Sequence, residues 1–337
     1  MPREKVSRDE FVRVWDAEGG SPTRVAERLG IAVQNVHQRR VRLAGDGILL
    51  KTADYRAGKR WGWQEAAPKW PKRREINIRD ATAIIGSDAH LWPGMETTAW
   101  RAFKALVGTL KPKLGILNGD TLDGSRVTRH DPIALECTPD LAEEIEWVKD
   151  ETADLRKRSR GTDWYWTCGN HDTRFERYLA KNAPEMRNVK GSCLQDHIGW
   201  PFSWSIMLNP NSSPVMVKHA FRGGAHAVYN NTLQAGISIV TGHLHAQLVR
   251  PFTDYRGTRY GVDCGTLADL SGPQFNYTLD NPLNWRSGFA VLTFDKDGIL
   301  LPPELCEVQT LDGSKQRAVF RGEVIATGEA YREDVAA

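Results

Sequence analysis

Five short polar motifs constrain the fold of this chain more than any other feature, because each one directly follows a short apolar run. The motifs are, in order, Asp88-Ala89-His90, Gly119-Asp120-Thr121-Leu122-Asp123, Gly169-Asn170-His171-Asp172, His219 and Gly242-His243-Leu244-His245. The runs are rich in β-branched or aromatic residues, as is typical of buried strands, and cover residues 81–86, 113–117, 163–167, 214–217 and 237–241. Since α/β proteins place their sites at the carboxyl ends of strands, we expect the motifs to converge at one sheet edge.

The side chains of these motifs supply seven oxygen and imidazole donors. A pair of divalent cations that share one carboxylate requires about that many protein ligands, with water or substrate completing the coordination. Five of the nine histidines of the chain lie in the motifs. Because scattered structural histidines would not keep this order and spacing, we interpret the set as a dinuclear metal site.

In content and order the five motifs resemble those of the calcineurin-like metallophosphoesterase superfamily, whose pattern runs DxH, GDxxD, GNHD or GNHE, H and GHxH. The resemblance covers roughly residues 76 to 300. It implies an α/β fold, a four-layer sandwich of two mixed β-sheets flanked by helices. It also implies a metal-dependent phosphoesterase, a hydrolase that acts on ester bonds.

The resemblance further implies a role for each motif residue. The metal ligands would be Asp88, His90 and His245 for one ion, Asn170, His219 and His243 for the other, and Asp120 as the bridge. His171 would face the substrate phosphate and protonate the leaving oxygen, and Asp172 and Asp123 would orient His171 and the metal ligands. His226 is an alternative to His219, but it falls in a stretch that we expect to be helical.

The chemistry of the donors agrees with these roles. Two cations neutralise an anionic phosphodiester and lower the pKa of a water nucleophile. A bridging carboxylate such as Asp120 offers two oxygens, and imidazole titrates near neutral pH, as an acid at His171 requires. Mixed oxygen and imidazole donors suit Mn²⁺, and Fe or Zn also accept them.

Composition excludes several classes of protein. No apolar run approaches the roughly 18 residues that cross a membrane, so we expect no membrane association. The five cysteines form no CxxC pair, which favours a reducing cytoplasm, the host cytoplasm if the chain is encoded by a phage. The oligomeric state stays open.

Residues 1–50 are expected to form a small all-α domain of three helices with a helix-turn-helix pattern. The third helix would carry the DNA-binding side chains, because Gln, Asn and Arg read base edges and phosphates; these are Gln34, Asn35, Gln38, Arg39 and Arg40. Residues 1–75 carry 17 Lys and Arg against 10 Asp and Glu, whereas the remainder carries 28 against 32. That asymmetry favours nucleic acid as a partner, although such a module also binds protein or caps an enzyme.

Three further segments complete the predicted organisation. Residues 51–75 are a basic linker containing Trp and residues 76–309 the phosphoesterase domain. Residues 310–337 are a polar C-terminal tail that is loosely attached or forms a small cap. Substrate contacts outside the motifs are predicted in surface loops, at Arg129, His130 and Arg222.

Together these observations favour hydrolysis of phosphodiester bonds in nucleic acid, by a nuclease or phosphodiesterase that the N-terminal module targets to DNA. One alternative is a phosphatase or cyclic-nucleotide phosphodiesterase for small phosphoesters or phosphoproteins, whose N-terminal module binds protein. Another is a non-enzymatic DNA-binding adaptor, and the intact donor set argues against it.

Overall fold

The computed structural model describes residues 6–48, 50, 70–130, 138–281, 283–312 and 314–332. The chain divides into two compact units, residues 1–69 and 70–337. Each unit has a hydrophobic core of its own. Within the described residues, no helix has the length and apolar character needed to cross a lipid bilayer.

The N-terminal unit contains the three helices predicted from the sequence. They are α1 (Arg8–Ala17), α2 (Pro22–Leu29) and α3 (Val33–Gly45). The Ser7 side chain caps α1 by accepting a hydrogen bond from the Glu10 N–H, and Gly30 turns the chain after α2 in the left-handed conformation, at φ 62°. The core of this unit consists of Phe11, Trp15, Val25, Ala26, Val36 and Leu43.

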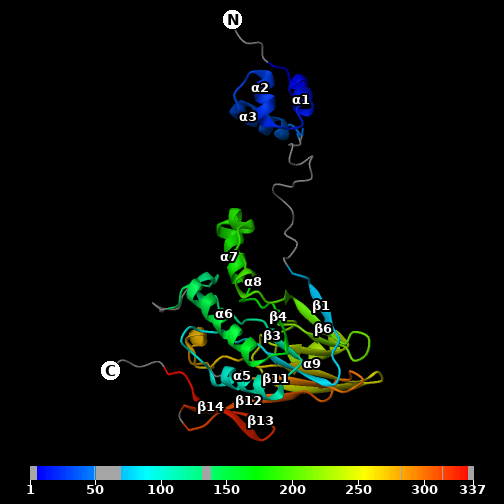
Figure 1. Ribbon diagram of the computed structural model, residues 1–337, viewed down its shortest axis with the longest axis vertical. Coiled ribbons are helices and arrows are strands. Elements are labelled where there is room, and N and C mark those ends of the chain that lie inside the picture. Colours follow the sequence, from blue (N-terminus) through cyan, green and yellow to red (C-terminus); the bar gives the residue numbers. More distant parts are fainter. Residues whose placement is uncertain are drawn as a thin grey trace, which may run out of the picture. The chain divides into compact units, whose positions relative to one another are not determined.

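The larger unit is built on two mixed β-sheets (Figure 1). The six-stranded sheet has the order β1 (Arg73–Ile76), β6 (Ser205–Leu208), β7 (Val215–Val217), β8 (Ser238–Thr241), β10 (Gly257–Asp263) and β9 (Leu248–Asp254). The eight-stranded sheet has the order β14 (Glu323–Glu329), β13 (Lys315–Phe320), β12 (Glu304–Thr310), β11 (Gly288–Phe294), β2 (Ala81–Gly86), β3 (Leu114–Asn118), β4 (Asp163–Thr167) and β5 (Phe202–Ser203).

The two sheets pack face to face, and helices cover their outer faces. Alternate side chains of β2 show this, because Ala83 and Ile85 enter the core between the sheets, whereas Ile84 faces the core beneath the helices. Helices α5 (Thr98–Leu110) and α6 (Leu141–Arg158) supply much of that second core, and α9 (Ala227–Ala235) packs on β8, β9 and β10. The predicted four-layer sandwich of two mixed sheets is confirmed.

Parallel pairing of the strands positions the motifs. In one sheet β2, β3 and β4 are parallel neighbours, with Ile85 opposite Ile116 and Ile116 opposite Tyr165. In the other sheet β7 and β8 are parallel neighbours. The carboxyl ends of these five strands precede the five motifs, so both sheets deliver polar side chains to the same region.

Short helices follow or connect the strands at this edge. They are α7 (Arg174–Asn182), α8 (Leu194–Ile198), η1 (Ser125–Val127), η2 (Pro184–Asn188) and η3 (Pro273–Thr278). Of these, η1 follows the β3 motif and α7 follows the β4 motif directly.

Two predicted boundaries differ from the structure. Residues 310–337 are not simply a loose tail, because β13 and β14 extend the eight-stranded sheet and pack against α5. In β13 the buried side chains of Gln316, Ala318 and Phe320 alternate with less buried ones, which is the two-residue period of a strand. The linker is also shorter than predicted, since Trp70 is buried against Phe202 and β1 begins at Arg73. The segment 51–69 lies outside the described residues.

Candidate metal centre

The five motifs converge, as expected, and their backbone is unusual. Five of the seven predicted ligands have positive φ angles of 39–70°, namely Asp88, His90, Asp120, His243 and His245. The left-handed region is uncommon for residues other than glycine, although Asp and His enter it more readily than most. The loops are also tied together, because the Asp88 N–H donates to Gly119 O and the His90 N–H donates to Asp120 O, each at 2.9 Å.

A first group of donors consists of Asp88, His90 and His245. Their ligand atoms lie within 4.8 Å of one another, and all three side chains are buried. His245 Nε2 lies 3.0 Å from Asp88 Oδ1. Burial alone would raise the pKa of Asp88, but the charges of His219 and His245 lower it to about 2, so Asp88 is a carboxylate at neutral pH.

A second group consists of Asp120, His219 and His243, again within 4.8 Å. His219 Nε2 lies 3.0 Å from Asp120 Oδ2 and 3.3 Å from Asn170 Oδ1. His226, the alternative to His219, is exposed at the start of α9. The geometry therefore favours His219.

The orientations of the imidazoles fit metal ligation. His90 Nδ1 lies 2.9 Å from Asp123 Oδ1, and His219 Nδ1 lies 2.9 Å from Asn118 O, so each ring is held through Nδ1. His90 Nε2 and His245 Nδ1 are buried, and no described residue offers either atom a hydrogen bond. Buried polar atoms rarely remain without a partner, and bound cations would satisfy both.

Two glycines leave room for this cluster. A Cβ atom built on Gly169 would overlap the Asp120 carboxylate, and one built on Gly242 would overlap Ser87 Oγ and Asp88 Oδ2. Glycine in the third and fifth motifs is therefore required by the close approach of the loops. The donor set, the unpartnered nitrogens and these glycines together fit a site for two divalent cations.

His171 belongs to a third group with His90 and Asp123. His171 Nδ1 lies 3.0 Å from Asp123 O and 3.1 Å from Asp123 Oδ1, so Asp123 orients His171 and His90 together. Burial lowers the pKa of His171, but the hydrogen bond to Asp123 and the charge of Asp120 outweigh it, and the pKa is raised overall. On its other side, Arg174 Nη2 donates to His171 Nε2 at 2.9 Å.

Among the described contacts, Asp172 makes none with the His171 ring, but it holds the backbone of the predicted ligand Asp120. Its carboxylate accepts hydrogen bonds from the N–H groups of Asp120, Thr121, Leu122 and Gly169 at 2.8–3.2 Å, and from Trp166 Nε1 at 3.0 Å. The side chain therefore fastens the second motif to the third. Burial and the charge of Asp120 raise the pKa of Asp172 to about 6.

Two charged residues near the site were not predicted. Arg174 is one, and Glu144 is the other; its carboxylate accepts hydrogen bonds from the N–H groups of Gly124 and Ser125 and from Ser125 Oγ, at 2.6–3.2 Å. Burial and the charge of Asp123 raise the pKa of Glu144 to about 7. The sequence offered one indication that Glu144 is buried, namely its position next to Ile145 on the apolar stripe of α6.

Three substrate contacts were predicted in surface loops, at Arg129, His130 and Arg222. Arg129 and His130 are exposed and contact each other at 3.5 Å. Arg222 is exposed, and its backbone N–H donates to Asn231 Oδ1. None of the described contacts joins these three side chains to the metal-site residues.

In the N-terminal unit, the predicted DNA-binding residues fall into two sets. Gln34, Asn35 and Gln38 are exposed on α3. By contrast, Arg39 donates to Val6 O and lies over the Phe11 ring, 5.1 Å from its centroid. Arg40 lies 5.8 Å from the Trp15 ring centroid. Both arginines thus have partners within their own unit.

Aromatic side chains border the cluster beside His245. The Trp285 ring lies 4.5 Å from the His245 ring, and Phe275 lies 5.3 Å from His90. Tyr277 is 56% exposed, and burial and the charge of Asp123 raise its pKa while Arg174 lowers it. We call Phe275, Tyr277 and Trp285 the aromatic rim.

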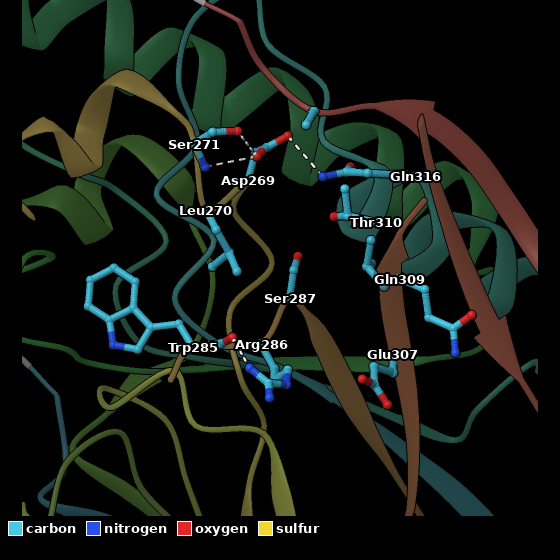
Figure 2. Close-up of a pocket in the computed structure, with 12 residues that line it drawn as sticks. Asp269, Leu270, Ser271, Trp285, Arg286, Ser287, Glu307, Gln309, Thr310 and Gln316 are labelled. Carbon is cyan, nitrogen blue, oxygen red and sulfur yellow. Dashed lines mark hydrogen bonds between the residues drawn. The ribbon is translucent and has the colours of Figure 1, made fainter. Parts of the chain in front are cut away.

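A pocket of about 550 Å³ opens next to this rim (Figure 2). Trp285 and Arg286 form one side of it, and the Arg286 N–H donates to His245 O at 2.7 Å. Asp269 holds the opposite side through hydrogen bonds with Ser271 and Gln316 (Figure 2). The segment 285–286 therefore separates the pocket from His245.

Comparison with curated proteins finds relatives in bacteriophages. Over 155 residues the chain is 29% identical to the Gene 54 protein of Mycobacterium phage L5 and, equally, to the Gene 54 protein of Mycobacterium phage D29. Each match covers 42% of this chain and 59% of the relative, so the chain spans little more than half of the length of these proteins. No protein-family model matches the chain.

Three solved structures share part of the architecture. A dimetal phosphatase from Danio rerio is 10% identical with a TM-score of 0.34, covering 74% of this chain and 99% of that one. TT1561 of Thermus thermophilus is 10% identical with a TM-score of 0.30, covering 56% and 90%. GAP50, the anchor in the inner membrane complex of Plasmodium, is 12% identical with a TM-score of 0.28, covering 75% and 89%. The geometry of the site, and not these similarities, therefore carries the functional argument.

Proposed function

We propose that this protein is a dinuclear metal-dependent phosphoesterase that hydrolyses phosphodiester bonds in nucleic acid. The observation that carries the proposal is the convergence of two donor groups, Asp88–His90–His245 and Asp120–His219–His243, beside an imidazole that Asp123 holds in place. Five of these six donors are buried. Chance clustering of surface carboxylates would not bury such donors or leave ring nitrogens without partners.

Two divalent cations, Mn²⁺ or alternatively Fe or Zn, would neutralise the phosphate and lower the pKa of the attacking water. Asp88, His90 and His245 would hold one cation, and Asn170, His219 and His243 the other. The Asp120 carboxylate lies 3.0 Å from His219 of the second group, and the Asp120 carbonyl accepts from the His90 N–H of the first group at 2.9 Å. These contacts support Asp120 as the residue that would serve both cations. These assignments retain the seven ligands predicted from the sequence.

His171 is the proposed general acid. Asp123 accepts from Nδ1, so Nε2 is the nitrogen that can face a substrate oxygen. Burial lowers the pKa of His171, but the hydrogen bond to Asp123 and the charge of Asp120 raise it overall. The raised pKa favours the protonated ring, which is the form that can protonate the leaving oxygen. The Asp123 carboxylate lies beside Nδ1 of both His171 and His90, so it stabilises a positive charge on either ring.

The aromatic rim supports nucleic acid as the substrate. Tyr277 is its exposed member, and an aromatic face beside a phosphate site allows a base to stack on it, independently of sequence. The exposed polar side chains Gln34, Asn35 and Gln38 of α3 support a DNA-targeting role for the N-terminal unit. Since the relatives are phage proteins, we place this activity in the host cytoplasm.

One observation favours an alternative for the N-terminal unit. Arg39 and Arg40 are engaged within the unit, and Val33 and Val41 are exposed on α3, with Val41 68% exposed. An apolar exposed helix face suits a protein partner, and small phosphoesters would then become the better substrate.

A substrate panel with Mn²⁺ tests the proposal. It compares single-stranded DNA, duplex DNA, RNA, a cyclic nucleotide, a phosphopeptide and a chromogenic diester, each with and without chelator. Chelator-sensitive cleavage of a nucleic acid supports the proposal, whereas hydrolysis of the cyclic nucleotide or phosphopeptide alone supports the alternative. If the protein binds two metal ions and hydrolyses none of these substrates, the proposed phosphoesterase function is refuted.

A further inference from the structure

We propose that Arg174 is a phosphate-binding residue that also covers His171 until substrate arrives. In this arrangement the guanidinium occupies His171 Nε2 in the empty site and transfers to a phosphate oxygen when a phosphate group enters. The uncovered imidazole nitrogen can then take a proton from a water molecule and pass it to the leaving oxygen. The inference rests on the proposed function for the roles of the metal ions and of His171.

The contacts of Arg174 carry the argument. Arg174 is the first residue of α7, so its side chain lies one turn from His171 on the same segment. Nη1 donates to Asp123 O at 2.9 Å, and Nη2 donates to His171 Nε2 at 2.9 Å. Because Nδ1 of His171 is already directed to Asp123, both ring nitrogens are occupied in this arrangement.

The partner at Nη2 is a replaceable one. A guanidinium has five N–H donors and forms its strongest, bidentate pairs with charged carboxylates and phosphates, whereas an uncharged ring nitrogen offers it a single acceptor atom. The nearest Asp123 carboxylate oxygen lies 3.9 Å from Nη1, at the limit of an ion pair. A phosphate oxygen beside His171 would therefore compete effectively for Nη2, while the bond from Nη1 to the Asp123 carbonyl stays in place.

The surroundings allow this exchange. The Arg174 side chain is 19% exposed and the His171 side chain 15% exposed, so both border the open side of an otherwise buried cluster. A purely structural bracket between α7 and the Gly124 loop would need only the bond to Asp123 O. Such a bracket would not require the second contact, in which Nη2 of Arg174 donates to Nε2 of His171.

The test uses the metal-loaded full chain and inorganic phosphate. Arg174→Ala should weaken phosphate binding by roughly 10- to 100-fold in calorimetry, the loss expected for a charge-assisted hydrogen bond. Arg174→Lys should recover part of the affinity. Arg177, which is exposed on the next turn of α7, supplies the matched control, and Arg177→Ala should change nothing.

A second readout follows the covering of His171. Diethyl pyrocarbonate modifies an accessible imidazole nitrogen, and the His171 peptide can be followed by mass spectrometry. Modification should be faster in Arg174→Ala than in the wild type or Arg177→Ala, with metal content unchanged. If Arg174→Ala does not fold, Arg174→Lys, which has a single terminal nitrogen, should still expose His171 to modification.

The outcomes separate this inference from the proposed function. If the wild type cleaves a diester while Arg174→Ala binds phosphate as tightly as the wild type, the inference is wrong and the function stands. If the wild type cleaves nothing but binds phosphate through Arg174, the proposed function fails and the phosphate site stands. Equal modification of His171 in both proteins would refute the covering role.

Discussion

His219 Nε2 lies 3.0 Å from Asp120 Oδ2, although both side chains are buried and both are proposed to bind metal. Burial lowers the pKa of His219, but the charges of Asp120 and Asp88 outweigh it and raise that pKa to about 10. In the metal-free protein, His219 Nε2 is therefore protonated at neutral pH, at the position where a cation would bind.

This relationship predicts how metal loading depends on pH. Loading must release the His219 proton, so the apparent metal affinity should rise with pH, by up to about tenfold per unit below the His219 pKa of about 10. The folding stability of the metal-free protein should instead decrease as pH rises. Its folded-state pKa is raised from 6.5, so the stability from His219 is complete below pH 6.5 and is lost as pH rises through about 10. Thermal unfolding with chelator across this pH range checks this, and a His219→Gln variant should show a flatter profile.

Loss of the bridging carboxylate should be the most damaging single change at the metal centre. Asp120→Asn removes one charge from a position that is proposed to serve both cations, whereas each histidine is assigned to one. We expect bound metal to fall from about two ions per chain toward zero, and activity to fall further than in His243→Ala. Elemental analysis with parallel rates measures both, and full activity after removal of all metal would refute the metal centre itself.

His171→Ala should retain metal yet lose turnover, by roughly 10²- to 10⁴-fold if the imidazole is the general acid. The loss should shrink for a nitrophenyl diester, because a good leaving group needs no proton. Rates on substrates with good and poor leaving groups, together with the metal content of the variant, distinguish an acid from a metal ligand. Metal loss would instead show that His171 is a ligand.

Asp172→Ala should affect folding before chemistry. Four backbone N–H groups and Trp166 Nε1 would lose their buried acceptor, at about 1–3 kcal/mol for each group left unsatisfied. We expect a loss of at least about 3 kcal/mol in the free energy of unfolding, measured by denaturant titration. A stable but inactive Asp172→Ala protein would contradict this role.

The N-terminal unit should be dispensable for the chemistry. Removal of residues 1–69 should leave hydrolysis of a chromogenic diester nearly intact and should weaken binding to duplex DNA, whose full-length affinity should fall steeply with salt. Removal of residues 1–75 should also destabilise the enzyme, because Trp70 and part of β1 are lost. Equal DNA binding by full-length and shortened chains would favour the alternative for this unit.

Within the N-terminal unit, the structure separates two kinds of side chain. Gln34→Ala with Gln38→Ala should weaken DNA binding without unfolding, because both residues are exposed. Arg39→Ala should lower the thermal stability of the unit, because it removes the contacts with Phe11 and Val6. Binding and melting curves of the two variants test this division.

The sequence was sufficient for features set by local pattern. Apolar runs before Asp88 and Asp120 identified the strands β2 and β3, and the three helices expected in residues 1–50 are present. The pairing of β13 with β12 could not be predicted, because short half-exposed strands acquire their stability from the sheet they join. The partners of Asp172 could not be predicted for a similar reason, since they are mostly backbone groups of the second motif, far away in the sequence. The proximity of Glu144 and Arg174 to the site could not be predicted either, because it depends on how α6 and α7 pack beside the Asp123 loop.

The left-handed backbone at five proposed ligands sets stability against activity at this edge of the sheets. Each such residue costs about 1 kcal/mol or more relative to glycine, which adopts this conformation freely. Glycine at Asp88 or His245 would relieve that backbone cost, but it would also remove a ligand. Metal binding and an unstrained backbone therefore make opposite demands on the same residues, and the strain in these loops is a cost of the metal site that a purely structural protein would not carry.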